Sequence, residues 1–290
     1  MFHNWLDRWD ERRAKRGEEG KKATVFALDA ERAFSGAAKI GSIEEFCLLA
    51  DQAVADQTFF DEPTRSDQGF KRRDGWLKFP SDTLTDIDEN NVVWARITES
   101  GSLDRAMVVF HHWNASARNN QLARFFSKRG ITVVEIAMPY HLERSRPGST
   151  HADYMLSANL GRTIQSIRQG VWDGRKLIRW LKSEGYREIS VLGMSLGSWV
   201  AGLIAAHDAT VSKASLFLAA GSLADMVWTG RATRSIRESL EPDIELTDLR
   251  RAWRHLTSRI TRIVWHDRIS FFTLCWRREI KWCCQSCRRG

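Results

Sequence analysis

The sequence contains little cysteine and, over most of its length, no excess of either charge. Four of its five cysteines and eleven of its 44 basic residues lie after residue 249. The preceding 249 residues carry 33 basic and 34 acidic side chains, so the net charge of +8 belongs to the tail. The tail is therefore the one place for a nucleic-acid-binding arm. Its Cys284-x-x-Cys287 pair lacks the second pair that a structural zinc site needs.

Long apolar runs are also missing. The first 22 residues are charged from Asp7 onward and hold no apolar segment of the kind found in secretory signals. The longest uncharged run, Ile189 to His207, is interrupted by three glycines and three serines. We interpret it as a buried strand and helix rather than a membrane span. We therefore expect a cytoplasmic protein with one sizeable core, no membrane span and no nucleic-acid partner.

The segment Arg187 to Asp208 holds the pattern on which the functional prediction depends. An apolar run typical of a buried strand ends at Leu192, residues 193–197 follow as Gly-Met-Ser-Leu-Gly, and apolar residues then recur at helical spacing. Strand, G-x-S-x-G turn and helix together predict a nucleophile elbow. The glycines avoid collisions with the neighbouring strand and helix. The turn exposes the Ser195 hydroxyl and directs the N–H of Leu196 at an incoming oxyanion.

On these residues, the stretch from Trp76 to Ser222 resembles the α/β-hydrolase superfamily, which includes serine esterases, lipases, thioesterases and peptidases. The resemblance implies an α/β fold, in which helices flank a mostly parallel sheet. It also implies hydrolysis of an ester, thioester or amide through an acyl-enzyme on Ser195. The substrate would be a small acyl compound, and neither a metal nor an organic cofactor is implied.

A second set of candidate site residues follows the strand expected at 107–110. The resemblance implies that this loop supplies another oxyanion donor, and we assign that role to the backbone N–H of Trp113. His112 stands where the family often has glycine, so it would have to adopt a backbone geometry that glycine adopts freely. We expect His111, His112, His141 and Met194 to line the pocket. In the simpler alternative, Trp113 and these histidines only form its wall.

Four regions are expected along the chain: a helical extension (1–73), the hydrolase core (74–222), a lid-like helical segment (223–253) and an aberrant basic tail (254–290). Within the core we predict strands at 75–79, 91–98, 107–110, 132–138, 189–192 and 213–220, and helices at 117–129 and 163–184. Strands that alternate with helices of this length predict parallel pairing with right-handed crossovers. In the lid, Thr247 is the expected N-cap of a helix.

The expected catalytic partners of Ser195 are missing. A serine nucleophile needs a base and usually an acid to orient it, and in this family both come late in the chain. His207 ends the elbow helix far from the serine at its start, and His266 is followed directly by Asp267, which is too close to orient it. His255 is likewise not part of a sequence pattern that would identify it as the catalytic base. The triad is therefore incomplete.

The composition of the tail suggests why. Trp282-Cys283-Cys284 is encoded by TGG TGY TGY. We translated the tail from Leu274 back into its possible codons and read these codons two nucleotides later. The shifted frame permits the peptide Leu-Ala-x-x-Asp-Lys-Val-Val-Leu-Pro-Glu-Leu. This peptide resembles the acid-bearing loop of α/β-hydrolases. We expect residues after about Arg254 to be a frameshifted translation, with the sheet truncated after its sixth strand. The alternatives are a non-catalytic remnant of a hydrolase and a nucleic-acid-binding protein that acts through its basic tail.

Overall fold

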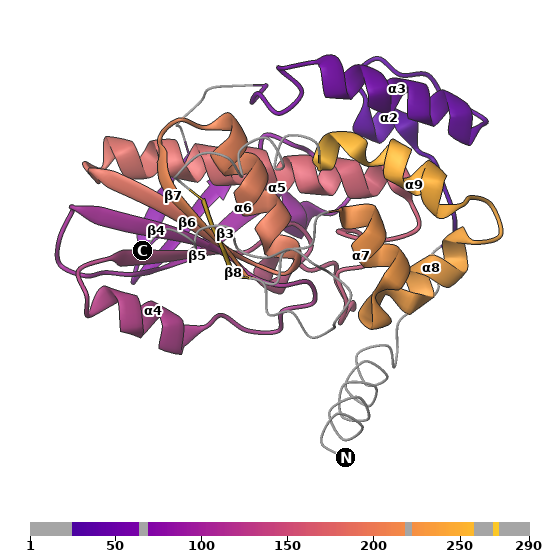
Figure 1. Ribbon diagram of the computed structural model, residues 1–290. Helices are drawn as coiled ribbons and strands as arrows, with labels where there is room; N and C mark the ends of the chain where they lie inside the picture. Colours follow the sequence, from indigo (N-terminus) through magenta and orange to yellow (C-terminus); the bar gives the residue numbers. More distant parts are fainter. Residues whose placement is uncertain (1–24, 64–68, 218–221, 258–268, 273–290) are drawn as a thin grey trace, which may run out of the picture.

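The computed structural model describes residues 25–63, 69–217, 222–257 and 269–272, and these residues build a single sheet with helices around it (Figure 1). The described part of the sheet has eight strands in the order β1-β2-β3-β5-β4-β6-β7-β8. The strands are β1 (Lys71–Arg73), β2 (Trp76–Pro80), β3 (Val92–Thr98), β4 (Arg105–Phe110), β5 (Thr132–Ile136), β6 (Glu188–Met194), β7 (Val211–Phe217) and β8 (Ile269–Phe272).

The sheet is antiparallel at one end and parallel through the rest. Strands β1, β2, β3 and β5 pair antiparallel in that order, whereas β5, β4, β6, β7 and β8 pair parallel. Strands β4, β5 and the middle of β6 are buried almost throughout, as expected when helices cover both faces of a parallel sheet. The carboxyl ends of these strands therefore meet at one edge, where ligands bind in open α/β sheets.

Helices lie on both faces of this sheet. They are α2 (Ala30–Ala33), α3 (Ile43–Ala55), α4 (Asn120–Ser127), α5 (Leu160–Ser183), α6 (Leu196–His207), α7 (Leu223–Thr229), α8 (Arg234–Leu240) and α9 (Leu246–Ala252). Figure 1 shows α4 on one face and α5 and α6 on the other. Met107 and Val109 of β4 pack with Ala123 of α4, and the main core fills the α5–α6 side.

The extension and the lid-like segment pack on each other. Helix α3 contacts α9, α9 contacts α7, and α2 lies against α5. Figure 1 shows α7, α8 and α9 together at one end of the molecule. None of the helices in the described part of the chain is both long and apolar enough to span a bilayer.

The fold class predicted from the sequence is confirmed, with three differences in detail. Strand β1 precedes the first expected strand, so the sheet begins before Trp76. Strand β8 pairs with β7, so the expectation that the sheet ends after its sixth strand is wrong. The N-cap of α9 is Glu245 rather than Thr247: the Glu245 N–H donates to Asp248 across 2.9 Å, and the Glu245 side chain accepts in return from the Asp248 N–H. This reciprocal capping box satisfies two backbone donors at once.

Candidate active site at the β6–α6 turn

Ser195 occupies the turn between β6 and α6 with a strained backbone. Its φ of 50° and ψ of −120° lie in a region that residues with a side chain rarely adopt, and such strain persists only where the surrounding structure enforces it. The residue is half-buried. Helix α6 begins at Leu196, so the Leu196 N–H is among the first helical amides, which lack an acceptor within the helix.

The two glycines of the turn are required by close backbone contacts. A Cβ added at Gly193 would lie 2.4 Å from the carbonyl oxygen of Gly197. A Cβ at Gly197 would lie 2.4 Å from the carbonyl oxygen of Phe110 and 2.5 Å from that of His111. Carbon and oxygen atoms do not approach so closely, so only glycine fits at either position. The second contact also places the carboxyl end of β4 directly against the elbow.

The carboxyl end of β7 holds the elbow from the other side. The carbonyl oxygen of Phe217 accepts hydrogen bonds from the N–H of Ser195 (2.9 Å) and from the hydroxyl of Ser198 (2.8 Å). The elbow is therefore fixed between the ends of β4 and β7. These contacts restrain the backbone of Ser195, which keeps its strained conformation.

The loop after β4 is fixed by two histidines. The Nε2 atom of His111 accepts from the Met138 N–H (3.1 Å), so its proton lies on Nδ1, which donates to the carbonyl of His112 (2.9 Å). In the same way, Nε2 of His141 accepts from the Asn114 N–H (2.9 Å) and Nδ1 donates to the carbonyl of Pro139 (2.8 Å). The His111 and His141 rings meet edge to face, with centroids 4.7 Å apart.

Both histidines are therefore neutral and fully engaged. Burial lowers the pKa of His111 to about 4, and it lowers the pKa of His141 well below its ordinary value. Each ring nitrogen already has a partner, so neither ring offers a lone pair to the Ser195 hydroxyl. Their observed role is to hold the two loops together.

The glycine-like backbone conformation that the sequence predicts at His112 occurs instead at Asn114. The positive φ belongs to Asn114 (56°), and the side chain of Asn114 accepts from the Ala152 N–H (2.8 Å). The indole of Trp113 donates to the carbonyl of Ala152 (3.2 Å). A second segment, around Ala152, thus anchors the loop, and the glycine-like conformation falls on Asn114, a residue type that tolerates it better than most.

The remaining candidate bases lie elsewhere. His207 ends α6, with its ring 4.9 Å from that of Phe60. His255 is only 2 % exposed and packs against the rings of Phe34 and Phe59. Neither nitrogen of His255 has a hydrogen-bond partner among the described residues, and burial lowers its pKa to about 3. His266 and Asp267 lie outside the described residues, as do the tail cysteines.

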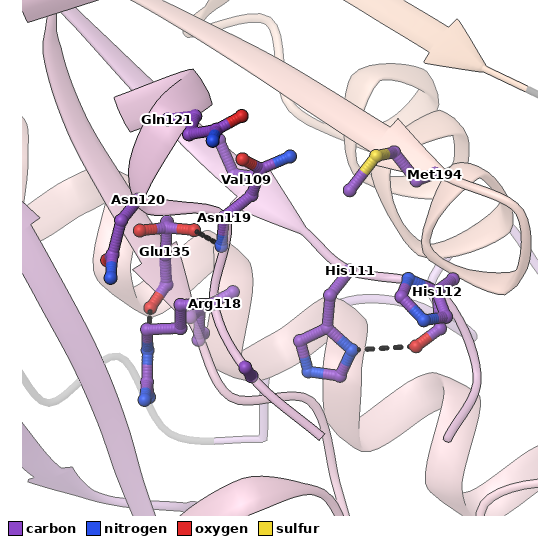
Figure 2. A pocket seen from close by; sticks show the side chains of 11 residues that line it. Val109, His111, His112, Arg118, Asn119, Asn120, Gln121, Glu135 and Met194 are labelled. Carbon is purple, nitrogen blue, oxygen red and sulfur yellow. Dashed lines mark hydrogen bonds between the residues drawn. The ribbon is translucent and has the colours of Figure 1, made fainter. Parts of the chain in front are cut away.

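A cavity of about 410 Å³ opens beside the elbow, between α4 and the carboxyl ends of β4, β5 and β6 (Figure 2). Three of the expected pocket residues, His111, His112 and Met194, line it; Ser195, Trp113 and His141 do not. Met194 directly precedes Ser195, and His112 directly precedes Trp113, so the cavity adjoins the elbow without containing it. The other lining residues are Val109, Ala117, Arg118, Asn119, Asn120, Gln121, Glu135 and Ile136.

Two charged residues at this cavity are absent from the sequence-based prediction. Glu135 is a buried carboxylate in β5, a strand that is buried throughout, and a charged residue beside Val133, Val134 and Ile136 is a signal that the sequence does contain. Arg118 forms a bidentate pair with Glu143 (2.6 and 2.7 Å). Glu143 lies 25 residues further along the chain, and only the fold brings the two together.

A buried ion pair supports the segment that carries His141. Arg144 and Asp173 lie 2.9 Å apart and are 0 % and 1 % exposed. Arg144 donates to the carbonyls of Ala137 and Asn90, and Asn90 in turn accepts from the Tyr140 N–H (2.9 Å). The turn at 139–141, with its positive φ at Tyr140 (61°), is thereby tied to the centre of α5. In the described part of the chain, no cluster of His, Cys, Asp and Glu is suited to a metal ion.

Comparison with known proteins gives structural matches only. No protein-family model matches the sequence, and a search of curated proteins finds no relative. Acetyl xylan esterase 1 from Thermoanaerobacterium sp. JW/SL YS485 matches with a TM-score of 0.51 and 14% identity, covering 86% of this chain and 82% of the esterase. The acetyl xylan esterase from Paenibacillus sp. R4 matches with a TM-score of 0.50 and 13% identity, covering 84% and 81%.

Another match is less extensive. The chain spans 64% of the length of a cold-adapted esterase from an Arctic intertidal metagenomic library, with a TM-score of 0.37, 19% identity and 52% of this chain covered. The two acetyl xylan esterases, taken with the strand order and the elbow, show that the chain has the α/β-hydrolase fold.

Proposed function

We propose that the chain is a serine hydrolase that cleaves a small acyl ester, thioester or amide through an acyl-enzyme on Ser195. The observation that carries the proposal is the strained backbone of Ser195 (φ 50°, ψ −120°), held between two glycines that close contacts make obligatory. Strain of this kind is concentrated at functional sites, and it presents the hydroxyl at the edge of the sheet where ligands bind.

In this mechanism the Ser195 oxygen attacks the carbonyl carbon of the substrate, and the carbonyl electron pair moves onto its oxygen. The N–H groups of Leu196 and Trp113 stabilise the oxyanion. The intermediate collapses by breaking the bond to the leaving group, which takes up the proton lost by Ser195. Water then hydrolyses the acyl-enzyme and restores the serine. We assign the segment 223–253 as a lid over this site.

The ester class is favoured over thioesters and amides. The two proteins of matching fold are named as acetyl xylan esterases, and from them we extend only the class of bond to this chain.

A second candidate function, a non-catalytic remnant of a hydrolase, is favoured by one observation. His111 and His141 use both ring nitrogens, and His255 is enclosed by aromatic rings, so none of these three histidines is available to activate Ser195. Without a base, turnover falls by several orders of magnitude, and only the weak contribution of the oxyanion donors is left.

Hydrolysis of p-nitrophenyl acetate by purified protein separates the two functions. The hydrolase predicts turnover that falls by roughly a thousandfold or more in Ser195→Ala. Ser190→Ala is the matched control, because Ser190 lies on β6 and its hydroxyl donates to the carbonyl of Ala106 (3.2 Å); it should retain the wild-type rate. Equal rates for wild type and Ser195→Ala would contradict the hydrolase and favour the remnant.

A further inference from the structure

The cavity beside the elbow contains a carboxyl group that the reaction at Ser195 does not use. Glu135 is 4 % exposed. Its Oε1 atom accepts from the Asn119 N–H (2.7 Å), whereas its buried Oε2 atom has no partner among the described residues. A buried acceptor without a partner is costly in free energy and uncommon in folded proteins. A ligand that donates a hydrogen bond would remove this cost.

The charges around Glu135 argue against a cationic ligand. Arg118 stands at the same cavity, where its guanidinium is already held by Glu143 and its Nε donates to the backbone carbonyl of Glu135 (3.2 Å). Burial raises the pKa of Glu135, more than the Asn119 N–H and Arg118 lower it. A higher pKa favours the neutral carboxyl, which both donates and accepts hydrogen bonds, as a hydroxyl group does.

The rest of the lining combines an apolar floor with uncharged polar groups. Val109, Ile136 and Met194 contribute apolar surface, and Asn120 and Gln121 bring exposed side-chain amides at the start of α4 (Figure 2). A small molecule with apolar faces and several hydroxyl groups matches this combination. The volume of about 410 Å³ lies in the lower part of the ~300–1,000 Å³ range typical of small-molecule sites.

We propose that this cavity binds the neutral, hydroxyl-rich leaving group of the ester cleaved at Ser195, with Glu135 as its buried hydrogen-bonding residue. The proposal rests on the proposed function, because the ligand becomes a leaving group only if Ser195 is acylated. The cavity meets the elbow through Met194, next to Ser195, and through His112, next to Trp113. In this proposal the ester bond lies at the serine and its alcohol portion lies in the cavity.

A ligand can reach the Oε2 atom of Glu135 only if side chains around it move. The Oε2 atom has almost no exposed surface, and Asn120 lines the same cavity as Glu135 (Figure 2). Asn120 is exposed, and rotamer changes of exposed side chains take picoseconds to nanoseconds. Rotation of exposed lining side chains such as Asn120 is therefore the route by which a ligand hydroxyl would reach Glu135.

Ligand binding to the Ser195→Ala protein tests the subsite without any need for catalysis. Saturation-transfer NMR titrations would compare methyl glucoside with cyclohexylamine, which has a similar ring and carries a positive charge. We expect saturable binding of methyl glucoside and none of the amine. In Glu135→Met the dissociation constant should rise roughly tenfold, as loss of one buried hydrogen bond implies. Glu135→Gln, which still donates and accepts, should stay within about threefold.

Glu188→Met is the matched control, because Glu188 is exposed at the amino end of β6; it should bind as the parent does. The proposed subsite would be overturned if methyl glucoside did not bind, if it bound equally well to Glu135→Met, or if the amine bound more tightly. None of these results would bear on the proposed hydrolysis at Ser195. Glucoside binding that depends on Glu135 in a protein without Ser195-dependent turnover would support the pocket and contradict only its role as a leaving-group site. Circular dichroism of each variant shows that it is folded.

Discussion

The elbow glycines allow a test at the scale of single atoms. Gly197→Ala puts a Cβ 2.4 Å from the carbonyl oxygen of Phe110, so either the end of β4 or the turn must move. We expect the melting temperature to fall by several degrees and the reactivity of Ser195 to drop by roughly a hundredfold. Gly41→Ala is the control, since a Cβ there meets nothing within 4 Å. Similar losses in both variants would contradict the conclusion that close backbone contacts require glycine at position 197.

His255 gives a second test at the same scale, through its pKa. The pKa of about 3 in the folded protein lies below the ordinary value of 6.5, so the unfolded chain takes up the proton first. The contribution of neutral His255 to the free energy of unfolding is therefore complete above pH 6.5 and is lost as the pH falls toward 3. The loss is about 2 kcal/mol between pH 6.5 and pH 5, because each pH unit corresponds to ~1.4 kcal/mol.

His255→Phe removes this titration and suits the aromatic surroundings of Phe34 and Phe59. Urea unfolding at pH 7 and pH 5 should show a smaller acid-induced loss for the variant than for wild type. The variant should also keep the esterase rate, because His255 does not act as the base. A lost rate with intact folding would identify His255 as catalytic after all.

At the scale of elements, the buried pair of Arg144 and Asp173 connects α5 to the turn that carries His141. Asp173→Leu leaves a buried guanidinium without its partner and should lower the free energy of unfolding by about 3–5 kcal/mol. The double variant with Arg144→Met should recover part of this loss, because no unpaired charge remains. Denaturant unfolding measures both.

The exposed pair of Arg251 and Asp51, 2.7 Å apart, is the control for the buried one. Asp51→Ala should change the free energy of unfolding by no more than ~1 kcal/mol, since water and salt screen exposed pairs. Equal effects of Asp51→Ala and Asp173→Leu would show that the buried pair has no special structural role.

The start of α9 provides another test on an element. Asp248→Ala removes half of the capping box and should cost about 1 kcal/mol of stability, observed as faster amide hydrogen exchange in α9. Asp243→Ala, at an exposed position three residues before α9, should leave exchange unchanged. Unchanged exchange in the Asp248 variant would mean that packing against α3, not the cap, holds the helix.

The regular elements were predictable where a local pattern determines them. The elbow strand and helix, the α5 helix and the Ser42 cap of α3, whose hydroxyl accepts from the Glu45 N–H (3.2 Å), all follow from periodicity or capping chemistry over a few residues. Strand β1 was not predictable, because its three residues are exposed and charged. The cap of α9 was misassigned because Glu245 is an unusual N-cap beside a more typical threonine.

At the scale of the whole molecule, the fold class was predictable from the alternation of strands and helices together with the elbow. Contacts between distant segments were not. The pairing of Arg118 with Glu143, the cavity around Glu135 and the closure of α3 on α9 depend on how the sheet brings separate segments together. The same limit applies to the base for Ser195, which the sequence leaves unassigned.

The origin of the tail also belongs to this scale. We expect the nucleotide sequence from codon 245 onward to run open two nucleotides out of frame, through an acidic loop and a later Gly-His. Stops in that frame would contradict the frameshift and make the tail genuine. His266 would then be the base to mutate.

The central claim, a reactive Ser195 at a strained turn, is tested most directly by a fluorophosphonate probe and intact-protein mass spectrometry. We predict one covalent label per chain on Ser195, absent from Ser195→Ala and retained in Ser190→Ala. The label should also disappear when the protein is unfolded before the reaction, because the reactivity depends on the folded turn. A folded wild-type protein that takes up no label, or takes it up equally in Ser195→Ala, would contradict the claim.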